Sequence, residues 1–219
     1  MNAEWRLRDL SLRVLAASLL CVLAAWLIGE HLAQSYLPLL RWTYTALDRD
    51  HQLTELVISG QAAFRGADHV FKMTVVPDGL ILVGTRVVHS NPQGWASASV
   101  LIAYLWQPML AAILAASLWP VASYRELPLR LLLVAVLCVP LSMIDLPFVL
   151  WSLVWQNYVQ AFAPDLFSPL LIWADFLQQG GRYLLGGVVG VLAAYGAERV
   201  VSVRSRADLQ PDRRTIAKG

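Results

Sequence analysis

The stretch ASVLIAYLWQPMLAAILAASLWPV, residues 98–121, contains no charged side chain. A helix rises about 1.5 Å per residue and the apolar core of a bilayer is about 30 Å thick, so roughly 20 apolar residues are enough to cross it. A turn sequence, NPQGW at residues 91–95, precedes the stretch, and a tryptophan–proline pair at 119–120 closes it. We therefore predict a transmembrane helix over residues 98–121.

Three more segments of similar length are rich in apolar residues and poor in charge: residues 14–30, 131–155 and 177–201. The sequence therefore predicts a mainly α-helical integral membrane protein with four transmembrane helices. A cleaved signal peptide is the alternative for residues 14–30, but the sequence GEHLA at the end of this apolar segment lacks the small residues of a cleavage site. We expect the segment to remain as an uncleaved anchor.

The composition supports this class of protein. Hydrophobic residues make up 58% of the 219 residues and charged residues only 15%, as is typical of membrane proteins. A net charge of +2 does not favour binding to nucleic acid, and two cysteines do not suffice for a disulfide framework. Cys21 and Cys138 each follow an arginine by about two helical turns, which places both thiols at membrane depth, where a thiol stays protonated and unreactive.

Arginines flank the predicted spans on one side of the membrane. They occur in residues 1–13, in the turn at 122–130 and in the tail at 202–219, and positively charged flanks stay in the cytoplasm. We therefore expect both termini in the cytoplasm, with residues 31–97 and 156–176 on the opposite side. The polar tail is expected to be disordered.

The segment 31–97 divides into a helical and a strand-rich part. Apolar residues recur at helical spacing from Leu32 to Leu47, so this helix either continues the first span with a bend at Pro38 or lies along the membrane surface. The runs 56–58, 70–76 and 80–88 are rich in β-branched residues, and the sequence PDG after the second run marks a turn. We expect a sheet of about three strands, too small to bury a core alone and therefore packed on the membrane or on a partner.

Two ionisable side chains fall inside predicted spans, where a charge needs a partner. Asp145 follows Arg130, and Arg182 precedes Glu198, by about 22 to 24 Å of helix. The two side chains should therefore lie at the same depth and pair. Such a pair either fixes the docking of two helices or forms a site, open to the outside, in which Arg182 binds an anionic group.

Further polar residues lie close to this pair in the sequence. Asp175 is two helical turns from Arg182 on the same predicted helix face, which makes it a second acceptor. Gln178 and Gln179, followed by two glycines, lead into the predicted span. This polar stretch either lines a small cavity open to the outside or joins an interfacial helix to the span. Beyond it, small residues share one helix face and suit close helix packing: Gly186, Gly190, Ala193 and Ala197.

No catalytic signature is present in the sequence. It contains no serine-hydrolase elbow, no zinc-protease motif and no phosphate-binding glycine loop. The four histidines all fall in residues 31–97, and their spacing matches no zinc-ligand motif, so we expect them to be scattered over the surface: His31, His51, His69 and His89. We predict no catalytic residue, no cofactor and no metal ligand, which favours a protein that is not an enzyme and leaves a membrane hydrolase or transferase as an alternative.

The layout contains an N-terminal span, a strand-rich outer segment, a Ser90-Asn91-Pro92 turn leading through Gly94 and Trp95 into an apolar span, an arginine-flanked turn at 125–130 and a closing pair of spans. In this order of elements the chain resembles the small membrane proteins associated with exosortases, bacterial membrane enzymes that process C-terminal sorting signals. The resemblance covers most of the chain as architecture and carries no diagnostic motif. A sorting enzyme needs an accessible cysteine with histidine and arginine partners, and Cys21 and Cys138 do not fit this requirement. The resemblance therefore implies an accessory subunit of the bacterial inner membrane that lies beside a larger membrane protein.

Three functions therefore stay open. The first is a non-enzymatic inner-membrane accessory subunit of a cell-envelope protein-sorting or export system. The second is a binding or carrier protein for an anionic lipid or a lipid-linked intermediate, through Arg182 with Asp145 and Asp175. The third is a membrane hydrolase or transferase that uses these carboxylates. All three imply contact with membrane lipid and none implies nucleic acid.

Overall fold

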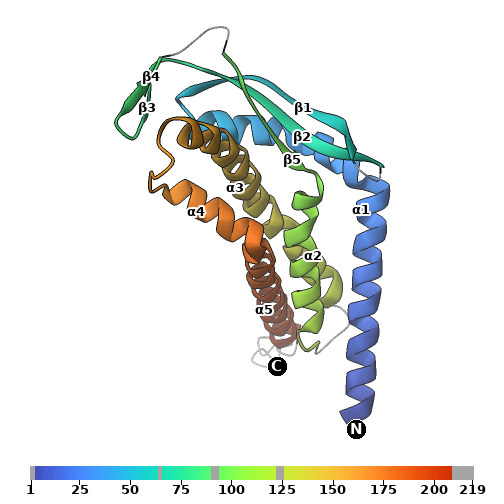
Figure 1. Cartoon of the computed structure of the whole chain (residues 1–219). Helices are drawn as coiled ribbons and strands as arrows, with labels where there is room; N and C mark the ends of the chain where they lie inside the picture. Colours follow the sequence, from blue (N-terminus) through green and yellow to red (C-terminus); the bar gives the residue numbers. More distant parts are fainter. Residues whose placement is uncertain (1–2, 64–65, 90–93, 122–125, 209–219) are drawn as a thin grey trace, which may run out of the picture.

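The computed structural model describes residues 3–63, 66–89, 94–121 and 126–208. It is mainly helical with a small antiparallel sheet at one end, as predicted (Figure 1). Three helical stretches are long and apolar enough to cross a membrane: Leu10–Leu47, Glu126–Phe162 and Pro169–Ser202.

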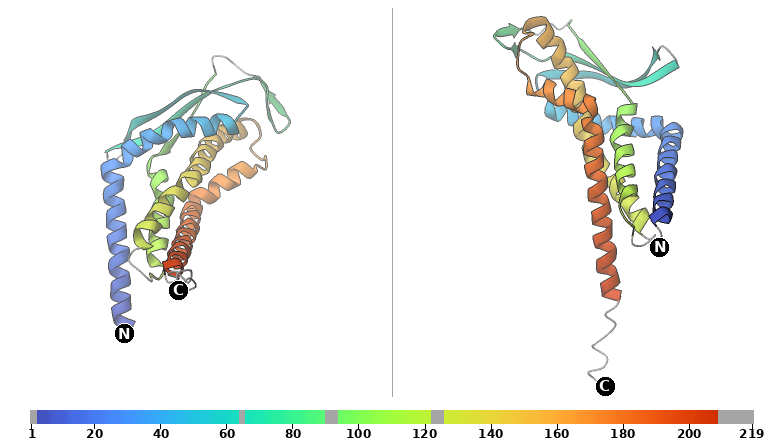
Figure 2. Two further views of the ribbon diagram at one scale, coloured as in Figure 1. Left: turned by 180° about the vertical axis from the view of Figure 1, so that it is seen from behind. Right: turned by 60° about the horizontal axis from the view of Figure 1, so that its bottom comes forward.

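Helix α1 (Ala3–Leu47) is continuous and consists of two limbs, which meet at a bend (Figures 1 and 2). The first limb leads from the N-terminus and is largely exposed. The second lies beneath the sheet, and its buried residues recur every three or four positions: Ala33, Tyr36, Leu40 and Tyr44. The helical pattern after residue 31 therefore continues the first predicted span, and its apolar face packs against the sheet.

The sheet has three antiparallel strands in the order β1 (His51–Ala63), β2 (Gly66–Pro77) and β5 (Ala96–Leu101). Its inner side chains pack on the second limb of α1 and on helix α3 (Glu126–Phe162). From Phe71 onward the side chains of β2 alternate, since Phe71, Met73 and Val75 are buried and Lys72 between them is exposed. The helices thus supply the core that three strands cannot build alone.

The run 80–88 does not provide the third strand of this sheet. It forms a separate hairpin, β3 (Ile81–Val83) and β4 (Arg86–Val88), which packs against the end of α3. Gly79 and Gly84 precede and divide the hairpin with φ angles of 124° and 61°, values that glycine adopts without steric cost. These two turns send the chain away from the edge of β2, and β5 takes the place beside it.

The predicted helix over residues 98–121 is therefore wrong at its start. Residues 98–101 belong to β5, and helix α2 covers only Ala103–Leu118. The physical reason is the alternation at the start of the stretch, where Ala98 and Val100 are buried and Ser99 between them is exposed. Absence of charge fits a strand that faces a core as well as it fits a transmembrane helix.

Helix α3 is longer than the predicted span over 131–155 and contains two internal prolines. The first turn of α3 includes residues that were expected in the loop at 122–130, because the side chain of Arg130 is buried against the end of α2. The Arg130 guanidinium donates hydrogen bonds to the carbonyl oxygens of Ala116, Trp119 and Pro120 and to the Glu126 carboxylate. Arg130 thereby binds the free carbonyls at the end of α2 and fixes α3 beside it.

The last predicted span, 177–201, is part of a longer helical path. Helix α4 (Pro169–Phe176) passes through a π-helical turn, η1 (Leu177–Gly181), into helix α5 (Arg182–Asp208). Gly180 has a φ of 115°, which breaks the helix direction here. A short separate helix, α4, therefore precedes α5, and the polar stretch that includes Gln178 and Gln179 joins the two. Residues 202–208, expected in a disordered tail, are helical, and 209–219 lie outside the described residues.

Candidate functional site

A buried ion pair joins α5 to α3 at the centre of the helical part. Arg182 Nε lies 3.0 Å from Oδ1 and 2.7 Å from Oδ2 of Asp145. The two side chains are only 1% and 3% exposed. The predicted pair of Asp145 and Arg182 is therefore formed, and it joins two different helices as expected.

The same guanidinium also contacts a third helix, α2. The Arg182 Cζ atom lies 4.0 Å from the centroid of the Tyr104 ring on α2, a distance at which the cation is attracted to the ring face. Pro108, one turn later in α2, has no N–H, so the Tyr104 carbonyl has no helical donor. Arg182 Nη2 is buried without a hydrogen-bond partner among the described residues. The cluster therefore holds α2, α3 and α5 together and leaves a donor that an acceptor oxygen could use.

The other polar residues predicted for this cluster do not reach it. Asp175, Gln178 and Gln179 are exposed, whereas Arg182 is buried. Their assignment assumed a continuous helix from Asp175 to Arg182. The π-helical turn and the positive φ at Gly180 break that helical register, so the side chains before the turn point elsewhere.

The small residues of α5 lie against α2, as their spacing predicts. A Cβ atom placed on Gly186 would be 2.2 Å from the Pro108 carbonyl oxygen, and one on Gly190 would be 2.2 Å from the Ala112 carbonyl oxygen. Ala193 and Ala197 continue this face and are fully buried. The absence of side chains lets the two backbones touch, which brings Arg182 within reach of α2.

A second buried cluster, at the junction of α1 and β1, was not predicted. Tyr44 Oη donates a hydrogen bond of 2.5 Å to Asp48 Oδ2. His51 Nδ1 lies 2.9 Å from Asp48 Oδ2 and 3.1 Å from Oδ1. The His51 ring packs beside Tyr158 of α3, with 5.5 Å between ring centroids, and its Nε2 is buried without a partner among the described residues.

The expectation of scattered surface histidines is wrong for His51, which is 7% exposed, whereas the other three histidines are exposed. Its neighbour Asp48 is buried as well. Burial alone would raise the pKa of the Asp48 carboxyl, but the hydrogen bonds from His51 and Tyr44 outweigh it and hold that pKa below its ordinary value. The signal in the sequence is local, since Tyr44, Asp48 and His51 follow one another at helical spacing.

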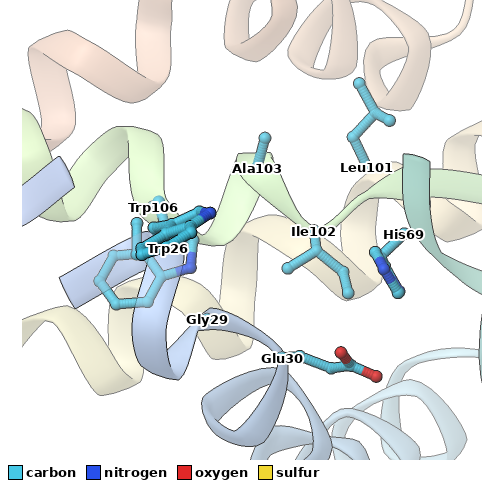
Figure 3. Close-up of a pocket in the computed structure, with 9 residues that line it drawn as sticks. Trp26, Gly29, Glu30, His69, Leu101, Ile102, Ala103 and Trp106 are labelled. Atoms are coloured by element: carbon cyan, nitrogen blue, oxygen red, sulfur yellow. The ribbon is translucent and has the colours of Figure 1, made fainter. Parts of the chain in front are cut away.

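A groove lies between the first limb of α1, the edge of the sheet and the start of α2. It has a volume of about 730 Å³. Figure 3 shows the indole rings of Trp26 and Trp106 on one side and the side chains of Glu30 and His69 on the other. Trp106 Nε1 is buried and has no hydrogen-bond partner among the described residues. The groove thus combines aromatic surface, a carboxylate and one hydrogen-bond donor without a partner.

Neither cysteine lies in these clusters, and both are buried and free. Within the described residues, no three histidine, cysteine, aspartate or glutamate side chains gather as a metal site. Comparisons with protein-family models, with curated proteins and with solved structures gave no match for this chain.

Proposed function

We propose that this chain is an integral protein of the bacterial inner membrane that crosses the bilayer four times. The path of the chain supports this topology, because the first limb of α1, α2, α3 and α5 run alternately toward and away from the sheet (Figure 1). Helix α2 is the short member, and its 16 residues rise about 24 Å. It lies among α1, α3 and α5, and Arg130 binds carbonyls at its end, so the backbone groups at that end are satisfied inside the protein.

The orientation follows from charge. The start of α1 and the end of α5 lie at the end of the molecule opposite the sheet (Figure 1). Arginines are concentrated in these terminal segments of the sequence. Since arginine-rich flanks remain in the cytoplasm, both termini are cytoplasmic and the sheet faces outward.

Its role in this proposal is that of a non-enzymatic accessory subunit of a cell-envelope protein-sorting or export system, of the exosortase-associated type. The observation that carries the proposal is the open edge of β1. This strand has 13 residues and pairs only with β2 within the described part of the chain. An unpaired strand edge binds a strand of another protein through main-chain hydrogen bonds.

The sheet is held in one position for such docking. Its inner face is packed on α1 and α3, and the cluster of Asp48, His51 and Tyr44 fixes the start of β1 to the end of α1. The ion pair of Arg182 and Asp145 in turn fixes α3 against α5. A partner that pairs with β1 would therefore meet a preformed edge and lose little conformational freedom of the sheet on binding.

Site-specific photo-crosslinking tests this role. A photoreactive residue is placed at Gln52 or Thr54, both exposed on β1, and the full-length chain is crosslinked in membranes before purification in mild detergent. We expect both positions to yield the same partner, a larger envelope membrane protein identified by mass spectrometry. The control position is Leu82, which is 64% exposed on the separate hairpin. Equal products at all three positions, or none at β1, would contradict docking through this edge.

A second candidate function rests on Arg182 Nη2, the buried donor without a partner. It is the binding of an anionic lipid or lipid-linked intermediate, whose oxygen atom would complete the guanidinium. Native mass spectrometry tests whether Arg182 binds a lipid or serves only as a structural partner of Asp145. The wild type and Arg182→Lys are compared in detergent with added phosphatidylglycerol. Loss of the lipid adduct from a folded variant supports binding, whereas equal adducts in both proteins exclude it.

A further inference from the structure

The groove beside α1 lies where an exposed apolar surface meets polar side chains. The first limb of α1 presents a stripe of exposed residues at helical spacing that leads to Glu30 in the groove: Leu15, Leu19, Leu23 and Trp26. Leu15 and Trp26 are 68% and 81% exposed. In the membrane, such a stripe is covered by acyl chains.

Beyond this stripe, the polar side chains of the groove are arranged in the same order as the parts of a phospholipid, from the acyl chains through the phosphate to the end of the headgroup. Trp26 is one helical turn, about 6 Å, before Glu30 along α1. Trp106, on α2, contributes an indole N–H without an acceptor, and His69, on β2, lies on the same side of the groove as Glu30 (Figure 3). A phosphate oxygen would accept a hydrogen bond from the indole, and the carboxylate of Glu30 would pair with a cation one turn further out.

We propose that this groove binds the headgroup of a phospholipid that carries an ammonium group. The acyl chains lie along the stripe below Trp26, the phosphate lies at Trp106, and the ammonium group pairs with Glu30. The indole face of Trp26 adds an attraction to the cation. An anionic headgroup without an amine is disfavoured, because the negative charge of its phosphate would lie near the Glu30 carboxylate with no ammonium group between them.

The inference rests on the membrane insertion proposed above and not on docking through β1. Failure of insertion would appear as an inability to reconstitute the chain in nanodiscs. Failure of lipid recognition would appear only in the lipid that reconstituted protein retains. The two failures are therefore distinguishable.

The test compares two lipids with the same acyl chains, phosphatidylethanolamine and phosphatidylglycerol. The chain is reconstituted in nanodiscs of equal parts of each, released gently, and the retained lipid is counted by native mass spectrometry. We expect the wild type to retain phosphatidylethanolamine in preference by about tenfold, the ratio that a charge pair with a cation–aromatic contact supports. In Glu30→Gln, which keeps only the aromatic contact of Trp26, the ratio should fall to about two or three. The matched control is Glu55→Gln, which removes an exposed carboxylate on β1, away from the groove, and should keep the wild-type ratio.

A second comparison needs no variant. N-acetylated phosphatidylethanolamine keeps the phosphate and the acyl chains but has no ammonium charge, and the wild type should not retain it in preference. Equal retention of the acetylated and unmodified lipids would overturn the proposal. So would an unchanged ratio in Glu30→Gln, a preference for phosphatidylglycerol, or a peptide segment in the groove that displaces the lipid.

Discussion

Replacing Gly186 with alanine should force α5 away from α2, whereas the same replacement at the adjacent Gly187 should not. An added Cβ at Gly186 would lie 2.2 Å from the carbonyl oxygen of Pro108 and 2.9 Å from its carbonyl carbon. These are backbone atoms, so no side-chain rotation relieves the clash. At Gly187 no atom lies within 4 Å of an added Cβ.

The size of the effect follows from these distances. Ordinary van der Waals contact begins at 3.4 Å, so the two helices would have to separate by about 1.2 Å at Gly186. Overpacking of this kind costs about 1 to 3 kcal/mol, and a rigid backbone contact belongs at the upper end. Alanine forms helix better than glycine at both positions, so this gain cancels when the two variants are compared. At about 2 to 4 °C per kcal/mol, Gly186→Ala should melt roughly 10 °C below Gly187→Ala.

The assay is thermal unfolding of the purified full-length variants in one detergent, with size-exclusion chromatography to show that both are monodisperse. Equal melting temperatures for the two variants would contradict close contact between the backbones of α5 and α2. In that case α5 would not be seated on the backbone of α2, and the position of Arg182 beside Tyr104 would have no support.

Three further predictions concern the buried polar groups. Arg182→Gln leaves Asp145 buried without its partner and should destabilise the fold by about 3 to 5 kcal/mol. The control, Asp175→Asn, changes an exposed carboxylate and should have little effect on the same unfolding curve. Equal stability of the two variants would contradict a structural pair. Because the pKa of Asp48 in the folded protein lies below its ordinary value near 3.8, its ionised form stabilises the fold above that pH, and the contribution is lost as the pH falls through the folded pKa. The stability difference between wild type and Asp48→Asn should therefore be full at pH 7 and shrink below about pH 4, and a difference independent of pH would exclude this role. The two buried cysteines should react with a maleimide only after denaturation, and rapid labelling of the native protein would show that one of them is accessible.

The sequence predicts those features that depend on one helix at a time. The constant rise of a helix brings Asp145 and Arg182 to the same depth, and the spacing of Gly186 and Gly190 marks one face, so both contacts could be derived by counting residues. The contact with Tyr104 could not, because it depends on how closely α2 and α5 approach.

Other features depend on competition between elements. Residues 98–101 are uncharged and satisfy a helical span, but β2 has an open edge that they complete as β5, and only the three-dimensional arrangement decides between the two. Similarly, the kink at Gly180 removes Asp175 from the neighbourhood of Arg182, and no count of residues along the sequence reveals it. The spacing of zinc ligands does not indicate His51, because a single carboxylate, that of Asp48, holds it.

Topology mapping tests the central claim, a four-span protein with the sheet outside the cytoplasm, most directly. Reporters that distinguish the cytoplasm from the outside are fused after Asp78, Val121, Asp165 and Asp208, one in each fusion protein. We expect the reporters after Asp78 and Asp165 to lie outside the cytoplasm and those after Val121 and Asp208 to lie in the cytoplasm. If the fusion after Val121 reads as outside, like the fusion after Asp78, α2 does not cross the membrane and the four-span account is wrong.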